Sequence, residues 1–208
     1  MKKTLWMMLV GSVVLVALSD QSFAGRRALV YQGPGACAEG CAQAAYDMAA
    51  RNGFIPTYVG PNALNSKTSD KDVQELFRDV AVWIQPGGKS KIVMQNMTPQ
   101  MVRALRDFVS NGGGYVGFCA GAFASTRIVG TTHVAGYGFL PGRTELYKSK
   151  KNADIIDITW NGVKRGVYWE GGPFIANLPA GKAEPTAFYP NGQIASARSI
   201  YGLGKVYV

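Results

Sequence analysis

A cysteine bracketed by glycines is the feature of this sequence best suited to chemistry. Gly117-Phe118-Cys119-Ala120-Gly121 has the spacing of a nucleophile elbow, with cysteine in the position usually held by serine. In such an elbow a buried strand turns sharply into a helix, and the flanking glycines relieve crowding around a strained nucleophile. The spacing therefore predicts that Cys119 lies at the carboxyl edge of a sheet and attacks carbonyl groups through its sulfur.

Two further cysteines, Cys37 and Cys41, lie four positions apart at the start of the first predicted helix. Nearby cysteines in an exported protein favour a disulfide. The Cβ atoms of residues i and i+4 in a regular helix are about 5–6 Å apart, whereas a disulfide needs about 3.5–4.5 Å. The bond therefore requires Cys37 to lie in the loop before the helix. Two thiols or a metal site are the alternatives; a metal site would also need Cys119 and the single histidine, His133. We expect no metal.

The elements that must position Cys119 alternate between strand and helix. Short apolar runs predict strands, and a capping box at Ser69–Asp72 and an N-cap at Thr98 predict helices between them. This order predicts a parallel sheet covered on both sides. Right-handed crossovers then place the Gly87-Gly88 turn and Cys119 at the same edge. The predicted strands before the elbow are 28–31, 54–59, 81–84 and 115–118.

After the elbow the pattern changes to β-hairpins. Asn161-Gly162 joins predicted strands at 154–159 and 163–169, and Asn191-Gly192 marks a second hairpin. A last strand is predicted at 204–208. The expected fold class is therefore α/β, with a mainly parallel sheet and an added β-hairpin region in the C-terminal half.

Residues 1–24 have the pattern of a secretory signal peptide. Lys2 and Lys3 precede an apolar segment from Leu5 to Leu18, and 22–24 offer small residues for cleavage after Ala24. We expect a periplasmic or secreted protein with one domain over 25–208 and no stable membrane anchor after cleavage. An uncleaved anchor is the alternative, although the apolar segment is shorter than the roughly 20 residues that span a bilayer.

Charge and motif content exclude several function classes. The formal net charge is +9, but the basic residues are scattered apart from a cluster at 148–151 and 164–165, which we interpret as a solvated edge. We therefore expect no nucleic-acid partner. The sequence contains no Walker motif, Rossmann fingerprint or HExxH, so we expect no cofactor. It indicates neither an oligomeric state nor the identity of a substrate.

Five short motifs, in order, resemble the biotin-protein-ligase N-terminal-like domain of the class I glutamine amidotransferase-like superfamily. The resemblance spans nearly all of residues 26–208 and implies a flavodoxin-like three-layer sandwich. It makes Cys119 the nucleophile and the N–H groups of Gly88 and Ala120 the oxyanion hole, and it places Glu170 near the site as an acid, base or ligand contact. The motifs lie at 28–35, 84–88, 112–122, 140–142 and 167–173.

The resemblance also implies a base that the sequence does not clearly contain. Superfamily amidotransferases supply it from a His-Pro-Glu motif after a late strand, and the run 201–208 resembles the strand that leads into that motif. We expect a chain that is either truncated relative to its relatives or has lost its base. His133 is a candidate substitute, with a structural or surface role as the alternative for a lone loop histidine.

Two functions follow from these features. The first is a cysteine-dependent amidase or hydrolase that acts through a thioester on a small-molecule or peptide amide. The second is a non-catalytic binding or accessory domain that keeps the pocket. A redox-active thiol protein is a third hypothesis. Biotin ligation itself is disfavoured, because the resemblance covers only the accessory domain of those enzymes.

Overall fold

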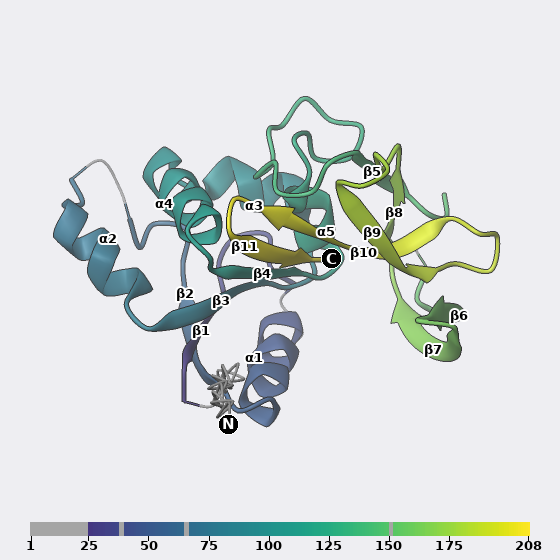
Figure 1. Cartoon of the computed structure of the whole chain (residues 1–208), viewed down its shortest axis with the longest axis horizontal. Coiled ribbons are helices and arrows are strands. Elements are labelled where there is room, and N and C mark those ends of the chain that lie inside the picture. Colours follow the sequence, from purple (N-terminus) through teal and green to yellow (C-terminus); the bar gives the residue numbers. More distant parts are fainter. Residues whose placement is uncertain (1–24, 38–39, 65–66, 150–151) are drawn as a thin grey trace, which may run out of the picture.

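The computed structural model describes residues 25–37, 40–64, 67–149 and 152–208, so the predicted signal peptide lies outside the described residues. The described strands form one sheet in the order β2-β1-β3-β4-β11-β10-β9-β6-β7, with β8 pairing β10 and β5 pairing β8 (Figure 1). The strands are β1 (Arg27–Tyr31), β2 (Ile55–Val59), β3 (Val80–Gln85), β4 (Gly114–Gly117), β5 (Arg143–Leu146), β6 (Asp154–Trp160), β7 (Val163–Trp169), β8 (Pro173–Ala176), β9 (Ala183–Phe188), β10 (Ile194–Tyr201) and β11 (Gly204–Tyr207). The helices are α1 (Cys41–Arg51), α2 (Asp70–Phe77), α3 (Ser90–Asn96), α4 (Pro99–Ser110) and α5 (Ala120–Ser125).

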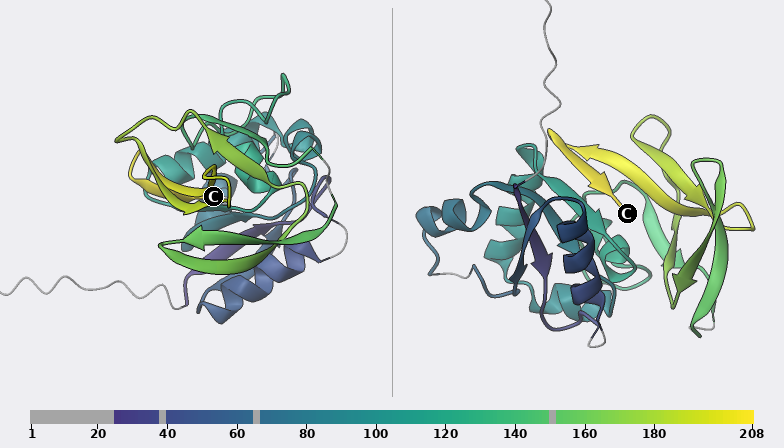
Figure 2. Two further views of the ribbon diagram at one scale, coloured as in Figure 1. Left: turned by 90° about the vertical axis from the view of Figure 1, so that its right-hand side faces the viewer. Right: turned by 90° about the horizontal axis from the view of Figure 1, so that it is seen from below.

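The sheet is mixed, and its two halves differ in strand direction. β1 pairs in parallel with β2 and β3, β3 with β4, and β4 with β11. The remaining pairs, from β11–β10 outward, are antiparallel. Figure 2 shows these antiparallel strands extending from one side of the α/β unit. The expectation of an α/β fold is confirmed, whereas the expectation of a mainly parallel sheet holds only for the five strands around β3.

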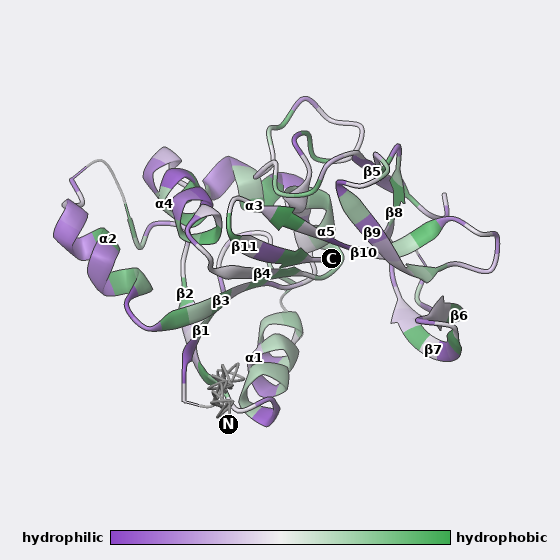
Figure 3. Cartoon of the chain, in the orientation of Figure 1, coloured by the Kyte–Doolittle hydropathy of each residue, from purple (hydrophilic) through white to green (hydrophobic). Residues whose placement is uncertain are grey.

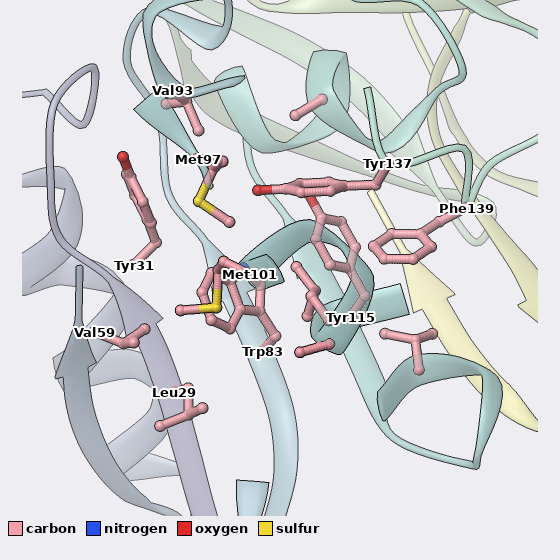
Figure 4. Close-up of a cluster of buried hydrophobic side chains, with 14 of the residues drawn as sticks. Leu29, Tyr31, Val59, Trp83, Val93, Met97, Met101, Tyr115, Tyr137 and Phe139 are labelled. Carbon is pink, nitrogen blue, oxygen red and sulfur yellow. The ribbon is translucent and has the colours of Figure 1, made fainter. Parts of the chain in front are cut away.

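Helices cover both faces of the parallel strands. Successive strand residues point to opposite faces, so β1 and β3 pack apolar side chains against helices on both sides. On one face α1 packs Ala45 and Ala49 against alternate residues of β1 and β3. The other face carries α3, α4 and a larger core (Figures 1 and 4). This core includes Leu29, Tyr31, Trp83, Val93, Met101, Leu105, Tyr115, Tyr137 and Phe139. The three-layer arrangement is therefore built from strands that are apolar on both sides, and Figure 3 shows the apolar colouring of these strands.

Local sequence signals account for most helix boundaries. Thr98 caps α4 by accepting a hydrogen bond from the Met101 N–H, and Ser69 and Asp72 form the capping box of α2. The apolar residues Val73, Leu76 and Phe77 of α2 are half-buried and pack against the edge of the core. α3 was not predicted; it is short and its first residue, Ser90, follows a cap that makes no side-chain hydrogen bond.

The C-terminal hairpins form as predicted. Asn161 and Gly162 have φ values of 48° and 79°, the positive values that a tight turn between β6 and β7 requires. The run 201–208 differs from its interpretation as one continuous strand, because β10 ends at Tyr201 and Gly202, with φ 60°, turns the chain into β11. Within the described part of the chain, no helix is long and apolar enough to cross a membrane.

Candidate functional site

Cys119 occupies a strained turn between β4 and α5. Its φ of 47° and ψ of −98° lie in a region that residues with side chains rarely adopt. The flanking glycines are sterically required: a Cβ at Gly117 would lie 2.7 Å from the carbonyl carbon of Gly121, and a Cβ at Gly121 would lie 2.3 Å from the Gln85 oxygen. The structure therefore has the backbone geometry that the Gly-x-Cys-x-Gly spacing predicts.

A polar network beneath the turn fixes it to the sheet. The Phe118 N–H donates to the Gln85 carbonyl at 2.9 Å, and the buried Tyr115 hydroxyl donates to the Gly121 carbonyl at 2.8 Å. The Gln85 side-chain oxygen accepts from Trp83 Nε1 and from the Tyr137 hydroxyl. Figure 4 shows the rings of Trp83, Tyr115 and Tyr137 within the buried cluster. Burial raises the pKa of both tyrosines, so they remain neutral donors.

The Cys119 thiol is half-buried and points toward the turn after β7. Its Sγ donates to the backbone carbonyl of Glu170 over 4.0 Å. The Glu170 carboxylate is exposed and accepts a 2.7 Å hydrogen bond from the Tyr168 hydroxyl. Glu170 is thus close to Cys119, as the sequence analysis expected, but it approaches through its backbone.

The Gly87-Gly88 turn lies directly against Cys119. A Cβ built on Gly87 would be 3.6 Å from the Cys119 Cβ. Gly88 has a φ of 138°, and a Cβ there would lie 2.0 Å from the Gly35 oxygen, so only glycine fits. Among the described residues, neither the Gly88 N–H nor the Ala120 N–H donates to a backbone carbonyl. Both residues expected to supply the oxyanion donors lie at the elbow. Their N–H groups make no backbone hydrogen bond within the described residues.

A disulfide joins Cys37 and Cys41 and lies against the same turn. Their Cα atoms are 5.5 Å apart, and Cys37 lies in the loop before α1, which begins at Cys41. A Cβ on Gly87 would be 3.3 Å from Cys41 Sγ. A hollow of about 270 Å³ lies beside this loop and is lined in part by Cys37 and Gln43, and Cys119 is not among its lining residues.

His133 lies on an exposed loop whose ends are joined by the hydrogen bond from the Val129 N–H to the Val134 carbonyl. Its imidazole makes no hydrogen bond or ion pair with any other described residue. The same part of the chain contains no group of three or more histidine, cysteine, aspartate or glutamate side chains placed to hold a metal.

Residues 26–135 match the family described as biotin-protein ligase, N terminal. The chain belongs to this family. The matched residues include the Gly87-Gly88 turn, Cys119 and His133. The motifs at 140–142 and 167–173, which contributed to the resemblance, lie beyond the matched region.

Solved structures of other proteins have the same fold over most of this chain. A crystal structure of a glutamine amidotransferase is 20% identical, with a TM-score of 0.64, and the match covers 86% of this chain and 87% of that one. A β-galactosidase from Bacillus circulans is 17% identical with a TM-score of 0.57, and the match covers 91% of this chain but 29% of that one. The fold is therefore that of a glutamine amidotransferase-like domain. A search of curated proteins finds no significant match.

One residue of this family member's site carried no signal in the sequence. Tyr189 ends a hairpin flank, and its hydroxyl donates to the Pro173 carbonyl at 2.9 Å. Burial is the main cause that raises its pKa to about 12, and the nearby Cys119 contributes. Tyr189 follows β9, whose pairing with β10 and β6 brings it beside Trp169 and Gly172 at the end of β7, and no local motif records that pairing.

Proposed function

We propose that this protein is an exported, cysteine-dependent amide hydrolase. Cys119 attacks the carbonyl of a small-molecule or peptide amide and forms a thioester, while the N–H groups of Gly88 and Ala120 stabilise the oxyanion. The observation that carries this proposal is the strained backbone of Cys119, since such strain is concentrated at active sites. Its export rests on residues 1–24 of the sequence.

The reaction divides into two steps. In the first, the C–S bond forms, the tetrahedral oxyanion collapses with breakage of the C–N bond, and the amine leaves with the proton that the thiol gives up. In the second, water attacks the thioester, releases the acid and returns the proton to sulfur. The Glu170 carbonyl accepts a hydrogen bond from a neutral thiol but repels a thiolate. Activation therefore requires the sulfur to turn away from the Glu170 carbonyl.

An activated ester tests the chemistry without knowledge of the natural substrate. The protein, lacking residues 1–24, is mixed with p-nitrophenyl acetate, and nitrophenolate release and acetylated protein are measured. We expect acetylation at Cys119, detected by peptide mass spectrometry. The Cys119→Ser variant should not be acetylated at this position at a comparable rate. Alkylation by iodoacetamide across pH provides the second measure. Slow alkylation with an ordinary thiol titration, and no acetylation at Cys119, would contradict the proposal.

A binding or accessory domain is the second candidate. It is favoured by the placement of the two acid–base candidates, because Tyr168 binds the Glu170 carboxylate and His133 lies on an exposed loop. In this case Cys119→Ser should leave stability and ligand binding nearly unchanged. Loss of a measured turnover in that variant would reject this candidate in favour of the hydrolase.

A further inference from the structure

We infer that the Cys37–Cys41 disulfide is a positioning device for the oxyanion turn. It ties Gly87-Gly88 to helix α1, so that loss of the disulfide weakens carbonyl chemistry at Cys119. The inference rests on the proposed function, in which Gly88 supplies one of the two donors. It assigns the two cysteines a role in the reaction without placing them in contact with the substrate.

Backbone hydrogen bonds join the loop that carries Cys37 to the glycine turn. The Cys37 N–H donates to the Gly87 carbonyl at 3.1 Å, and the Lys89 N–H donates to the Gly35 carbonyl at 2.7 Å. These two bonds flank Gly88 on both sides and pair it with Ala36 as an isolated bridge. In this pattern the bonds use the neighbours of Gly88, so its own N–H stays outside the ladder. The position of the loop therefore sets the direction of that N–H.

The disulfide joins this loop to a well-packed element. α1 is anchored on the sheet by the buried residues Ala42, Ala45 and Ala49. Its N-terminus has a left-handed glycine, Gly40, at the cap position and no side-chain capping bond from that residue. Instead, the Cys41 N–H donates to Cys37 Sγ at 3.2 Å. The sulfur thus caps the helix while the S–S bond holds the loop against it.

Direct packing adds a second connection. Cys41 Sγ and the Cys119 Cβ both lie next to the position that a Cβ on Gly87 would take, at 3.3 Å and 3.6 Å from it. The disulfide and the nucleophile therefore both pack against the glycine turn at Gly87. Without the S–S bond, the Gly33–Cys37 loop keeps its backbone bonds to the turn but loses its side-chain cross-link to α1 and is joined to the helix by the main chain alone.

Two reagents separate donor alignment from thiol reactivity. Acylation by p-nitrophenyl acetate passes through an oxyanion, whereas alkylation by iodoacetamide displaces iodide at a saturated carbon and forms none. An oxyanion hole depends on donors fixed in advance, and loss of one donor from the oxyanion hole of a serine protease slows it by about 10²–10³-fold. A misaligned Gly88 N–H should therefore slow acylation and leave alkylation unchanged.

The experiment compares the oxidised protein with Cys37→Ala/Cys41→Ala, and uses Cys119→Ser versions of both as backgrounds. We expect acylation of Cys119 to fall by about 10-fold or more, because a misaligned donor loses part of the roughly 10²–10³-fold effect of a removed one. Alkylation should change by less than about twofold. Circular dichroism and the melting temperature establish that the double variant is folded. Reduction of the native protein by a phosphine, followed by its removal, should reproduce the result if the double variant does not fold.

Hydrogen exchange tests the positioning without reference to catalysis. The Lys89 and Cys37 amides should exchange faster once the disulfide is absent, while amides of α4 should be unaffected. Equal acylation-to-alkylation ratios with and without the disulfide would overturn the inference and leave the hydrolase proposal intact. Unchanged protection of Lys89 would overturn it as well. If the oxidised protein is not acylated at Cys119 at all, the hydrolase proposal fails, and the exchange measurement still decides whether the disulfide positions the turn.

Discussion

Replacing Cys119 with glycine should give a more stable protein than replacing it with alanine. The native φ of 47° and ψ of −98° strain any residue that has a Cβ. Their mirror image, with both signs reversed, lies at the border of the extended region that ordinary residues adopt. Glycine has no Cβ and accepts both forms about equally. Both substitutions remove the sulfur, so the comparison isolates the backbone.

The expected difference follows from two opposing terms. A residue held in a sparsely populated backbone region costs about 1–3 kcal/mol. Glycine in turn loses more conformational entropy on folding than alanine, by roughly 0.5–1 kcal/mol. Cys119→Gly should therefore unfold with a free energy about 1 kcal/mol above that of Cys119→Ala. For a domain of this size that difference raises Tm by about 2–4 °C.

Urea unfolding followed by circular dichroism measures this difference, with equal m values as the condition for comparing midpoints. Ala122→Gly provides a matched control, since it makes the same alanine-to-glycine change within α5. It should destabilise by about 1 kcal/mol, because glycine is unfavourable in a helix. If Cys119→Gly is less stable than Cys119→Ala by a similar amount, the elbow stores no strain, and the observation that carries the proposed function is refuted.

Two further predictions concern the glycine turn and the buried tyrosines. Gly88→Ala should destabilise the fold by about 3 kcal/mol, because its Cβ would meet the Gly35 oxygen at 2.0 Å in a left-handed conformation. The control Gly192→Ala, whose Cβ would have no atom within 4 Å, should lose only about 1 kcal/mol. Equal changes in Tm would contradict the steric argument. Burial raises the pKa of Tyr31 and Tyr189 to about 12 from 10.0, so the folded state holds these protons more tightly than the unfolded state. The contribution of these two tyrosines to the free energy of unfolding should therefore be fully present below pH 10 and be lost as pH rises toward 12. The decline should be less steep in Tyr31→Phe, and a flat profile over this range would show that these hydroxyls ionise equally in both states.

Much of the parallel half and its nucleophile could be predicted because local signals determine it. The elbow spacing fixes where β4 must end, since only glycine fits at 117 and 121. Thr98 with Pro99, and Ser69 with Asp72, define helix starts through bonds within one turn of the chain. These features depend on neighbours in sequence, and such neighbours are visible in a pattern of residue types.

The surroundings of the thiol depend on contacts between distant segments. Glu170 approaches Cys119 through a carbonyl, which every residue carries, so its residue type gave no information about the contact. Tyr189 packs beside Trp169 through strand pairing across the hairpin region. The antiparallel half of the sheet likewise depends on register between strands, and no local pattern records that register.

The place of β11 in the sheet has a consequence for the order of folding. β4, which carries Cys119 at its end, pairs on one side with β3 and on the other with β11, whose residues come after all of the other strands in the chain. Parallel pairing between such distant segments must bear a loop-closure cost before its contacts form. The nucleophile should therefore acquire its final surroundings late in folding. Pulse-labelled hydrogen exchange should show the Val206 amide protected after the amides of β1 and β3.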